Sequence, residues 1–193
     1  MKIIFDLDDT VYNSPELRGN REKAILNALS NRADEYNKLR KIHSTTKSLE
    51  ILGITREEFY EILKGVPINL EKDEKLIDFF KELSNRFRLI VLSNSPKKCA
   101  ADVLECLGLI EIIDEIYGGD SFSEPKPSEE SFFIVEKGDI CIGNNFKKDL
   151  EIPGKKGAIT ILISKEKGML SEANFVIESI YEIKDILDKI SKE

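Results

Sequence analysis

Cysteine and histidine are scarce in this sequence, which has three cysteines and a single histidine among 193 residues. The cysteines Cys99, Cys106 and Cys141 are odd in number and lack the spacing of metal ligands. This argues against a disulfide framework and against a zinc site built from paired cysteines. Reduced thiols are typical of a cytosolic protein, so we expect a cytoplasmic location.

Long apolar segments are lacking as well. No apolar run approaches the roughly 20 residues that a transmembrane helix needs. Residues 1–5 have the apolar character of a strand and lead at once into acidic residues, a pattern unlike that of a signal peptide. We therefore expect a protein that does not act at a membrane and carries no secretion signal.

An excess of positive charge is also absent, because 29 Lys and Arg residues face 36 Asp and Glu residues, a formal net charge of −7. Proteins that hold nucleic acids bind the phosphate backbone through clustered Lys and Arg. An acidic chain argues against that role and leaves room only for local basic pockets. The 41% of apolar residues predicts a globular chain with a sizeable core.

Short apolar runs recur along the chain, each followed by a loop and in most cases by a helical pattern. They lie at residues 2–5, 89–92, 115–117, 140–142, 159–163 and 175–177. Continuous apolar runs of this length are typical of strands that are buried on both faces. Their alternation with helices predicts an α/β fold, a three-layer Rossmann-like core with a mainly parallel sheet.

A long polar segment with helical periodicity separates the first two runs. We expect helices at residues 21–42, 45–52 and 56–63, the last with a capping box formed by Thr55 and Glu58. This crossover exceeds what one connecting helix requires. The sequence therefore predicts a small helical cap at residues 15–68, inserted into an α/β core of residues 1–14 and 69–193. A helix at residues 73–83 returns the chain to the core.

The first strand ends directly in three carboxylates, Asp6, Asp8 and Asp9, followed by Thr10. Ligand sites in parallel sheets lie beyond the carboxyl ends of the strands. Carboxylates at this spacing repel one another unless a positive group holds them, and Mg²⁺ is the obvious hard cation. One aspartate could then attack a substrate while another handles the proton. The alternative is that these are ordinary turn and cap residues after a strand.

Two further segments could hold a phosphate. Ser93 and Asn94 follow the second strand, where a hydroxyl and backbone N–H groups at a turn into a helix suit a phosphate oxygen, although a plain helix cap has the same pattern. Lys126 lies between Pro125 and Pro127, which restrict its backbone and help to present its ammonium as a fixed point charge. Read alone, it would be a solvated surface lysine.

A fourth strand end carries Gly143 at the turn, with Asn144, Asn145 and Asp149 beyond it. In combination, the four segments resemble the ordered motifs of the haloacid dehalogenase superfamily: DLDDT at residues 6–10, LSN at 92–94, the lysine of PKP at 126, and GNNFKKD at 143–149. These motifs span nearly the whole chain. The joint match is much more specific than any one of them.

The resemblance implies that Asp6 attacks phosphorus to give an aspartyl-phosphate, while Asp8 protonates the leaving oxygen and later activates water. Covalent catalysis of this kind splits one difficult transfer into two. The resemblance further implies that Ser93, the backbone near Asn94, and Lys126 neutralise the phosphoryl oxygens. The metal ligands it implies for Mg²⁺ are the Asp6 side chain, the main-chain carbonyl of Asp8, and the pair Asn144 and Asp149.

Asp8 favours phosphoryl transfer over dehalogenation, because the dehalogenases of this superfamily resemble the pattern but lack the second aspartate. Asn144 is the principal departure, since the family more often has an aspartate there as a direct metal ligand. An amide oxygen can still coordinate Mg²⁺, with one negative charge fewer. The stretch after Lys126 is short, so the helix expected there is trimmed to residues 129–136.

The segment 43–59 (HSTTKSLEILGITREEF) and the start DLDDTVY resemble the pyrimidine 5′-nucleotidase-like branch. The polar residues that could face a substrate from the cap are Arg21, His43, Thr45 and Thr46, although a solvated helix-end histidine is the plainer interpretation of His43. We expect a phosphomonoesterase for a small phosphorylated metabolite, with a nucleoside 5′-monophosphate as the leading candidate. The alternatives are a phosphate-ligand binding protein that has lost turnover, motivated by Asn144, and a phosphomutase.

Overall fold

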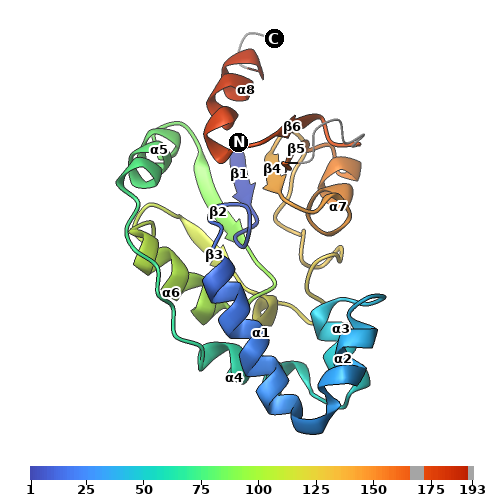
Figure 1. Cartoon of the computed structure of the whole chain (residues 1–193). Coiled ribbons are helices and arrows are strands. Elements are labelled where there is room, and N and C mark those ends of the chain that lie inside the picture. The colour runs from blue at the N-terminus through green and yellow to red at the C-terminus, as the bar shows by residue number, and fades with distance from the viewer. Residues whose placement is uncertain (166–171, 191–193) are drawn as a thin grey trace. The chain divides into compact units, whose positions relative to one another are not determined.

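A computed structural model of the chain describes residues 1–165 and 172–190. Its core is a sheet of parallel strands in the order β3-β2-β1-β4-β5-β6 (Figure 1). The strands are β1 (Lys2–Phe5), β2 (Arg88–Leu92), β3 (Glu115–Tyr117), β4 (Ile140–Gly143), β5 (Ile159–Ile163) and β6 (Phe175–Ile177). The parallel α/β sheet that the apolar runs predict is confirmed, and each strand begins and ends within one residue of its predicted bounds.

Strand β1 lies at the centre of the sheet. Ile4 pairs with Ile90 of β2 on one side and with Cys141 of β4 on the other. The side chains of β1, β2 and β4 are buried almost without exception. This double burial explains why these strands read as continuous apolar runs rather than as alternating patterns.

The order of the strands places a topological switch beside β1. The chain passes from β1 to β2 and β3 on one side, then returns to the other side of β1 to form β4. In open α/β sheets the crevice beyond the carboxyl ends of two such strands is the usual ligand site. Asp6 follows β1 and Asn144 follows β4, so two of the predicted site segments leave the sheet at this switch.

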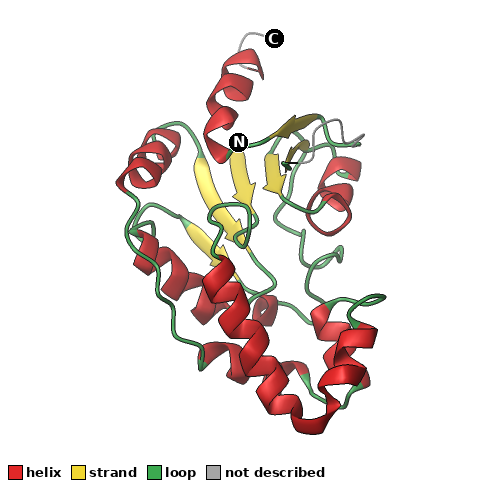
Figure 2. Cartoon of the chain, in the orientation of Figure 1, coloured by secondary structure: helices red, strands yellow, loops and turns green. Residues whose placement is uncertain are grey.

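Helices flank the strands of the core (Figure 2). They are α5 (Glu74–Ser84), α6 (Lys97–Leu107), α7 (Glu151–Lys155) and α8 (Ile183–Ile190). Helix α5 packs its apolar side on the sheet, with the rings of Phe5 and Phe80 5.0 Å apart. Among the described residues, none of the helices combines the length and apolar character that crossing a bilayer requires.

The helix expected at residues 129–136 does not form, because residues 129–134 make turns instead. The hydroxyl of Ser128 accepts a hydrogen bond from the backbone N–H of Ser131 (3.0 Å), and the Ser131 hydroxyl donates to the Ser128 carbonyl (2.9 Å). Such local side-chain hydrogen bonds offer the backbone an alternative to helical pairing. Phe132 is nevertheless buried in the core beside β4 and β5.

Contacts within the chain define two compact units, Met1–Asn13 with Glu71–Glu193, and Ser14–Leu70. The second unit is helical, with α1 (Pro15–Leu29), a 3₁₀ turn (Ser30–Arg32), α2 (Ala33–Leu39), α3 (Thr45–Ile51) and α4 (Arg56–Lys64). The capping box of α4 is confirmed, since Glu58 N–H donates to the Thr55 hydroxyl (3.2 Å) and Thr55 N–H to the Glu58 carboxylate (2.8 Å).

The single helix expected at residues 21–42 is wrong in two respects. Helix α1 begins earlier, at Pro15, where the Ser14 hydroxyl caps the N–H of Leu17 and proline fits the first turn. It also ends earlier, because Ser30 has a φ of 53° and breaks the helical path before α2 begins. The break depends on one backbone angle at Ser30, which the apolar pattern of the sequence does not record.

Candidate active site

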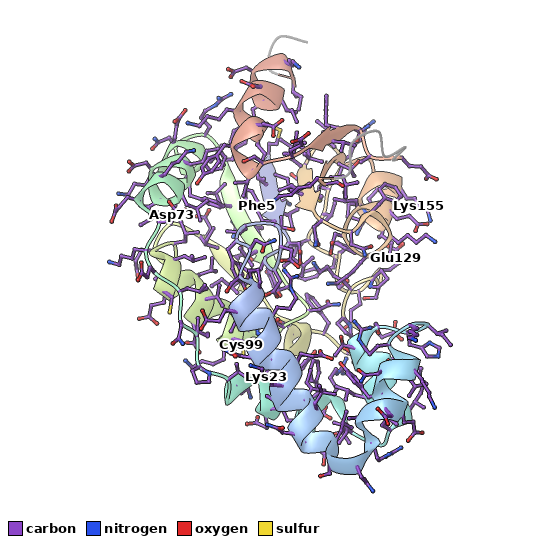
Figure 3. All side chains as sticks on the ribbon, viewed as in Figure 1. Phe5, Lys23, Asp73, Cys99, Glu129 and Lys155 are labelled. Atoms are coloured by element: carbon purple, nitrogen blue, oxygen red, sulfur yellow. The ribbon has the colours of Figure 1, made fainter. Side chains whose placement is uncertain are left out.

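Asp6 lies at the carboxyl end of β1, directly after Phe5, which is labelled in Figure 3. Its backbone N–H donates to the carbonyl of Ile142 on β4 (2.8 Å), so the strand pairing continues to this residue. The Thr10 hydroxyl donates to Asp6 Oδ2 (3.0 Å), and Asp6 is only 4% exposed. The sheet and the following turn therefore fix the orientation of this carboxylate.

Lys126 joins Asp6 to Asp149. Its ammonium donates to Asp6 Oδ1 and to Asp149 Oδ1, both at 2.8 Å, and all three side chains are buried. Residues that lie 120 and 23 positions away from Lys126 in the sequence thus meet at one nitrogen atom. A buried ion pair is strong only when each charge has hydrogen-bonded partners in fixed positions.

Asn94 holds the backbone of Lys126 in place. Its side-chain amide donates to the Lys126 carbonyl (2.7 Å), and its side-chain oxygen accepts from the Lys126 N–H (2.9 Å). This reciprocal pair ties the turn after β2 to the loop that precedes β4. The Asn94 side chain therefore positions the lysine, whereas the prediction for the phosphate concerned the backbone near Asn94.

The charges of this buried group shift one another's pKa values. Burial alone would raise the pKa of Asp6. The positive charges of Lys126 and Lys148 oppose this effect, and so do the hydrogen bonds that Lys126 and Thr10 donate. Together they hold the pKa of Asp6 below its ordinary value. Burial and the neighbouring Asp6 charge raise the pKa of Asp149 despite Lys126. Burial lowers the pKa of Lys126, yet Asp149 and Asp6 raise it well above its ordinary value. Asp6 is thus the more easily ionised carboxyl group.

Asp149 lies in a single π-helical turn, Phe146–Leu150, that follows β4. Its Oδ2 accepts the backbone N–H of Asn145 (3.1 Å), which leaves Oδ1 for Lys126. Gly143 makes this approach possible, since a β-carbon there would lie 2.5 Å from the Asp149 Cβ. The side chain of Asn144 is exposed at the end of β4.

Asp8 has partners of its own. The Tyr12 hydroxyl donates to Asp8 Oδ1, and the Ser95 hydroxyl donates to Asp8 Oδ2 (3.1 Å). Ser93 is buried, and its hydroxyl accepts the backbone N–H of Ser95 (3.0 Å). Sequence reasoning missed Tyr12 and Ser95, whose only signal was their place one to four residues after a predicted site residue.

The residues predicted for the metal can be tested against the donor atoms. In the described ranges no three His, Cys, Asp or Glu side chains cluster as a ready-made metal site. Two buried carboxylates, Asp6 and Asp149, do converge, and carbonyl and amide oxygens follow β1 and β4. Mg²⁺ is usually held by one or two carboxylates and otherwise by water and phosphate oxygens. This donor set fits a hard, oxygen-seeking cation of that kind.

The substrate residues predicted in the helical unit are partly exposed. Thr45 and Thr46 begin α3, His43 lies just before its capping residue Ser44, and Arg21 is on α1. The Tyr36 hydroxyl of α2 donates to Glu22 (3.4 Å), and burial and Glu22 raise the pKa of Tyr36. The residues of α3 that are buried within the helical unit are Ser48 and Leu49, not Thr45 or Thr46.

Comparison with solved structures supports the fold over nearly the whole chain. The HAD-hydrolase YfnB from Bacillus subtilis, solved bound to magnesium, is 15% identical with a TM-score of 0.65, covering 97% of this chain and 98% of that one. A HAD phosphatase from Thermococcus onnurineus is 20% identical with a TM-score of 0.60 and the same coverage. A 2-haloacid dehalogenase from Pseudomonas syringae is 15% identical with a TM-score of 0.64, covering 98% and 99%.

No curated protein matches the sequence. A family model described as haloacid dehalogenase-like hydrolase matches residues 3–137, which include Asp6, Asp8, Ser93 and Lys126 and end before Asp149. The match covers more than half of the chain, and the parallel sheet and ordered segments agree with it. This chain belongs to the haloacid dehalogenase-like hydrolase family.

Proposed function

We propose that this hydrolase is a Mg²⁺-dependent phosphomonoesterase that forms an aspartyl-phosphate on Asp6. The observation that carries the proposal is the different surroundings of its two carboxylates. Asp6 is buried and bound by Lys126, whereas Asp8 is partly exposed and bound by two hydroxyls. Two titratable groups in contrasting environments are the usual basis for dividing the nucleophile and acid/base roles.

In the first step, an ionised Asp6 oxygen attacks phosphorus and the bond to the ester oxygen breaks. The leaving oxygen takes the proton of Asp8 and departs as an alcohol, which leaves an acyl phosphate on Asp6 and a carboxylate on Asp8. The lowered pKa of Asp6 supports its role, because a nucleophile must be ionised at neutral pH. Lys126 lies beside the attacking Asp6 carboxylate and would offset the charge of the phosphoryl oxygens.

In the second step, Asp8 accepts a proton from water as the water oxygen attacks phosphorus. The acyl phosphate bond breaks, inorganic phosphate leaves, and the Asp6 carboxylate and the proton on Asp8 are restored. Buried Ser93 and the turn that follows β2 would bind phosphoryl oxygens in both steps. A phosphomutase would differ only in passing the phosphoryl group to a sugar hydroxyl instead of water.

Asp6 and Asp149 would hold the Mg²⁺, together with the main-chain carbonyl of Asp8 and the amide of Asn144. When bound, the cation would neutralise negative charge on the phosphate. Phosphoryl transfer is favoured over dehalogenation because Asp8 offers the proton that an ester oxygen requires on leaving. YfnB, a structural relative, was solved bound to magnesium, and the Thermococcus onnurineus relative is described as a phosphatase.

We further propose that residues 15–68 act as a cap that selects the leaving group, with Arg21, His43, Thr45 and Thr46 as candidate contacts. The likeness of the start DLDDTVY to the nucleotidase-like branch makes a nucleoside 5′-monophosphate the first substrate to test. Asn144 favours the second candidate function, a phosphate-ligand binding protein with little turnover, because it removes one negative charge from the metal ligands.

The test is a screen of phosphorylated metabolites with Mg²⁺, read by phosphate release, for the wild type, Asp6→Asn and Asp8→Asn. Both variants should lose turnover while keeping their circular dichroism spectrum. Asp6→Asn should never form a phosphoenzyme, whereas Asp8→Asn should form one from an activated ester and fail to hydrolyse it. Asp102→Asn, on the surface of α6, is the matched control. Wild-type turnover in Asp6→Asn would reject the nucleophile assignment.

A further inference from the structure

Both oxygens of the Asp8 carboxylate are engaged by hydroxyl groups, one on each atom. Tyr12 donates to Oδ1 and Ser95 donates to Oδ2 at 3.1 Å. These two donors come from different segments, the turn after β1 and the turn after β2, and both belong to the α/β unit. Opposed contacts of this kind limit rotation of a carboxylate about both of its side-chain torsions.

Each of these hydroxyls is itself held by the fold. A single parallel bridge pairs Asp8 with Tyr12, so the turn after β1 folds back on itself and brings the phenol to the carboxylate. The Ser95 N–H donates to the Ser93 hydroxyl (3.0 Å), and its carbonyl accepts the N–H of Gly119 (2.9 Å). Ser95 is only 9% exposed.

The turn that carries Ser95 packs tightly against the loop that follows β3. A β-carbon on Gly118 would lie 2.0 Å from the backbone nitrogen of Lys97, and that nitrogen donates to Asp120 (2.7 Å). The serine hydroxyl is therefore presented by backbone that has little freedom to shift. The Ser93 hydroxyl, proposed for the phosphate, shares this turn.

We propose that Tyr12 and Ser95 are positioning residues that aim Asp8 at the leaving-group oxygen. This inference rests on the proposed function, in which Asp8 is the general acid and base. A proton transfer depends steeply on the direction and distance of the acid, so a carboxyl group free to rotate spends less time in the productive geometry. Neither hydroxyl touches the reacting atoms, and both act through Asp8.

The dependence on the leaving group distinguishes this role from a general effect on the fold. An alkyl phosphate needs a proton on its leaving oxygen, whereas p-nitrophenyl phosphate releases a stable phenolate without one. Tyr12→Phe and Ser95→Ala should each slow phosphoenzyme formation from an alkyl phosphate by about tenfold to a hundredfold, with little change in KM. Formation from p-nitrophenyl phosphate should slow much less.

The measurement is the single-turnover rate of phosphoenzyme formation on Asp6 with the two esters. Ser95→Thr keeps a hydroxyl and should restore most of the alkyl ester rate. Tyr181→Phe, next to Phe79, and Ser84→Ala, at the end of α5, are matched controls that should leave both rates unchanged. Tyr12→Phe retains the ring, so it tests the proposal even if Ser95→Ala fails to fold.

The possible results distinguish failure of the positioning role from failure of the proposed phosphatase function. If the wild type forms no phosphoenzyme from any ester, the proposed function fails. The positioning role is tested once the wild type is active and Asp8→Asn shows the expected leaving-group dependence. It is overturned if the Tyr12 and Ser95 variants then lose rate equally with both esters, or lose none. A selective loss with the alkyl ester supports it.

Discussion

Gly143 and Asp149 approach each other so closely that a β-carbon at position 143 would lie 2.5 Å from the Asp149 Cβ and 3.0 Å from its Oδ2. Real β-carbons essentially never come so near another atom. Asp149 has little freedom to move away, because its carboxylate accepts hydrogen bonds from Lys126 and from the Asn145 N–H. The glycine at the end of β4 is therefore required for the place of a carboxylate six residues later.

Gly143→Ala should accordingly displace Asp149 from Lys126. We expect turnover in the proposed phosphatase reaction to fall by about tenfold or more, because a misplacement of about 1 Å at a catalytic site can cost a hundredfold. Gly154→Ala is the control, since its β-carbon would make an ordinary contact 3.5 Å from Thr160 and it lies within α7. The measurement is kcat of both variants from steady-state kinetics. Equal activity in the two would contradict the steric argument.

Lys126→Met should destabilise the fold, because it leaves Asp6 and Asp149 buried without their shared cation. Removing one partner from a buried ion pair costs about 3–5 kcal/mol in the free energy of unfolding. Urea denaturation at neutral pH measures this loss. Lys98→Met, which removes an exposed pair with Asp102 on α6, should change the free energy of unfolding little.

The stability that Lys126 contributes depends on pH in a definite direction. The pKa of Lys126 is raised in the folded state, so the stability it contributes is fully present below its ordinary value of 10.5 and declines only as pH rises through the raised folded value. The difference in the free energy of unfolding between wild type and Lys126→Met should therefore not shrink between about pH 7 and about pH 9. A difference that shrinks steadily within this window would show that the lysine does not hold its charge.

Asn144→Asp should lower the Mg²⁺ concentration that gives half-maximal activity, if the amide oxygen of Asn144 is a direct ligand. Magnesium prefers anionic oxygen ligands, and the substitution adds one negative charge to the site. Asp149→Ala should need more Mg²⁺ than either protein. Titration of activity against Mg²⁺ for the three proteins provides the measurement, and an unchanged requirement in Asn144→Asp would remove this residue from the metal site.

The three cysteines should differ in reactivity. Cys99, labelled in Figure 3, and Cys141 are buried, and Cys106 is partly exposed. Burial and the nearby Asp139 raise the pKa of Cys141, which makes its reactive thiolate scarcer at any given pH. Iodoacetamide at about pH 8 should label Cys106 first in the folded protein and all three thiols in urea. Peptide mass mapping gives the order, and early labelling of Cys141 would contradict it.

Replacing residues 15–68 by a short loop should preserve folding better than selectivity. The α/β unit has its own core around β1, whereas a cap of the proposed kind sequesters the reaction and contacts the leaving group. The ratio of kcat/KM for a nucleoside monophosphate to that for p-nitrophenyl phosphate should fall towards one. If the ratio is the same before and after the deletion, specificity does not reside in these residues.

Local sequence determined the strands and the capped start of α4 in this protein. Strands β1, β2 and β4 are buried on both faces, so their residues had to be apolar throughout, and the pattern was visible without the structure. The capping box of Thr55 and Glu58 was likewise readable, because all its atoms lie within four residues. The break at Ser30 and the turns at 129–134 were not readable, since one depends on a single backbone angle and the other on competing hydroxyls.

The sequence also determined which residue types end each strand, but only the tertiary structure decided how they pair. Lys126 could have been a solvated lysine in a proline-flanked loop, and its burial between Asp6 and Asp149 follows from the return of the chain to β4 across β1. The contacts of Tyr12 and Ser95 with Asp8 likewise depend on how two turns meet. A sequence pattern records local periodicity, whereas a buried charge or an aimed carboxylate is set by partners that only the fold brings within hydrogen-bonding distance.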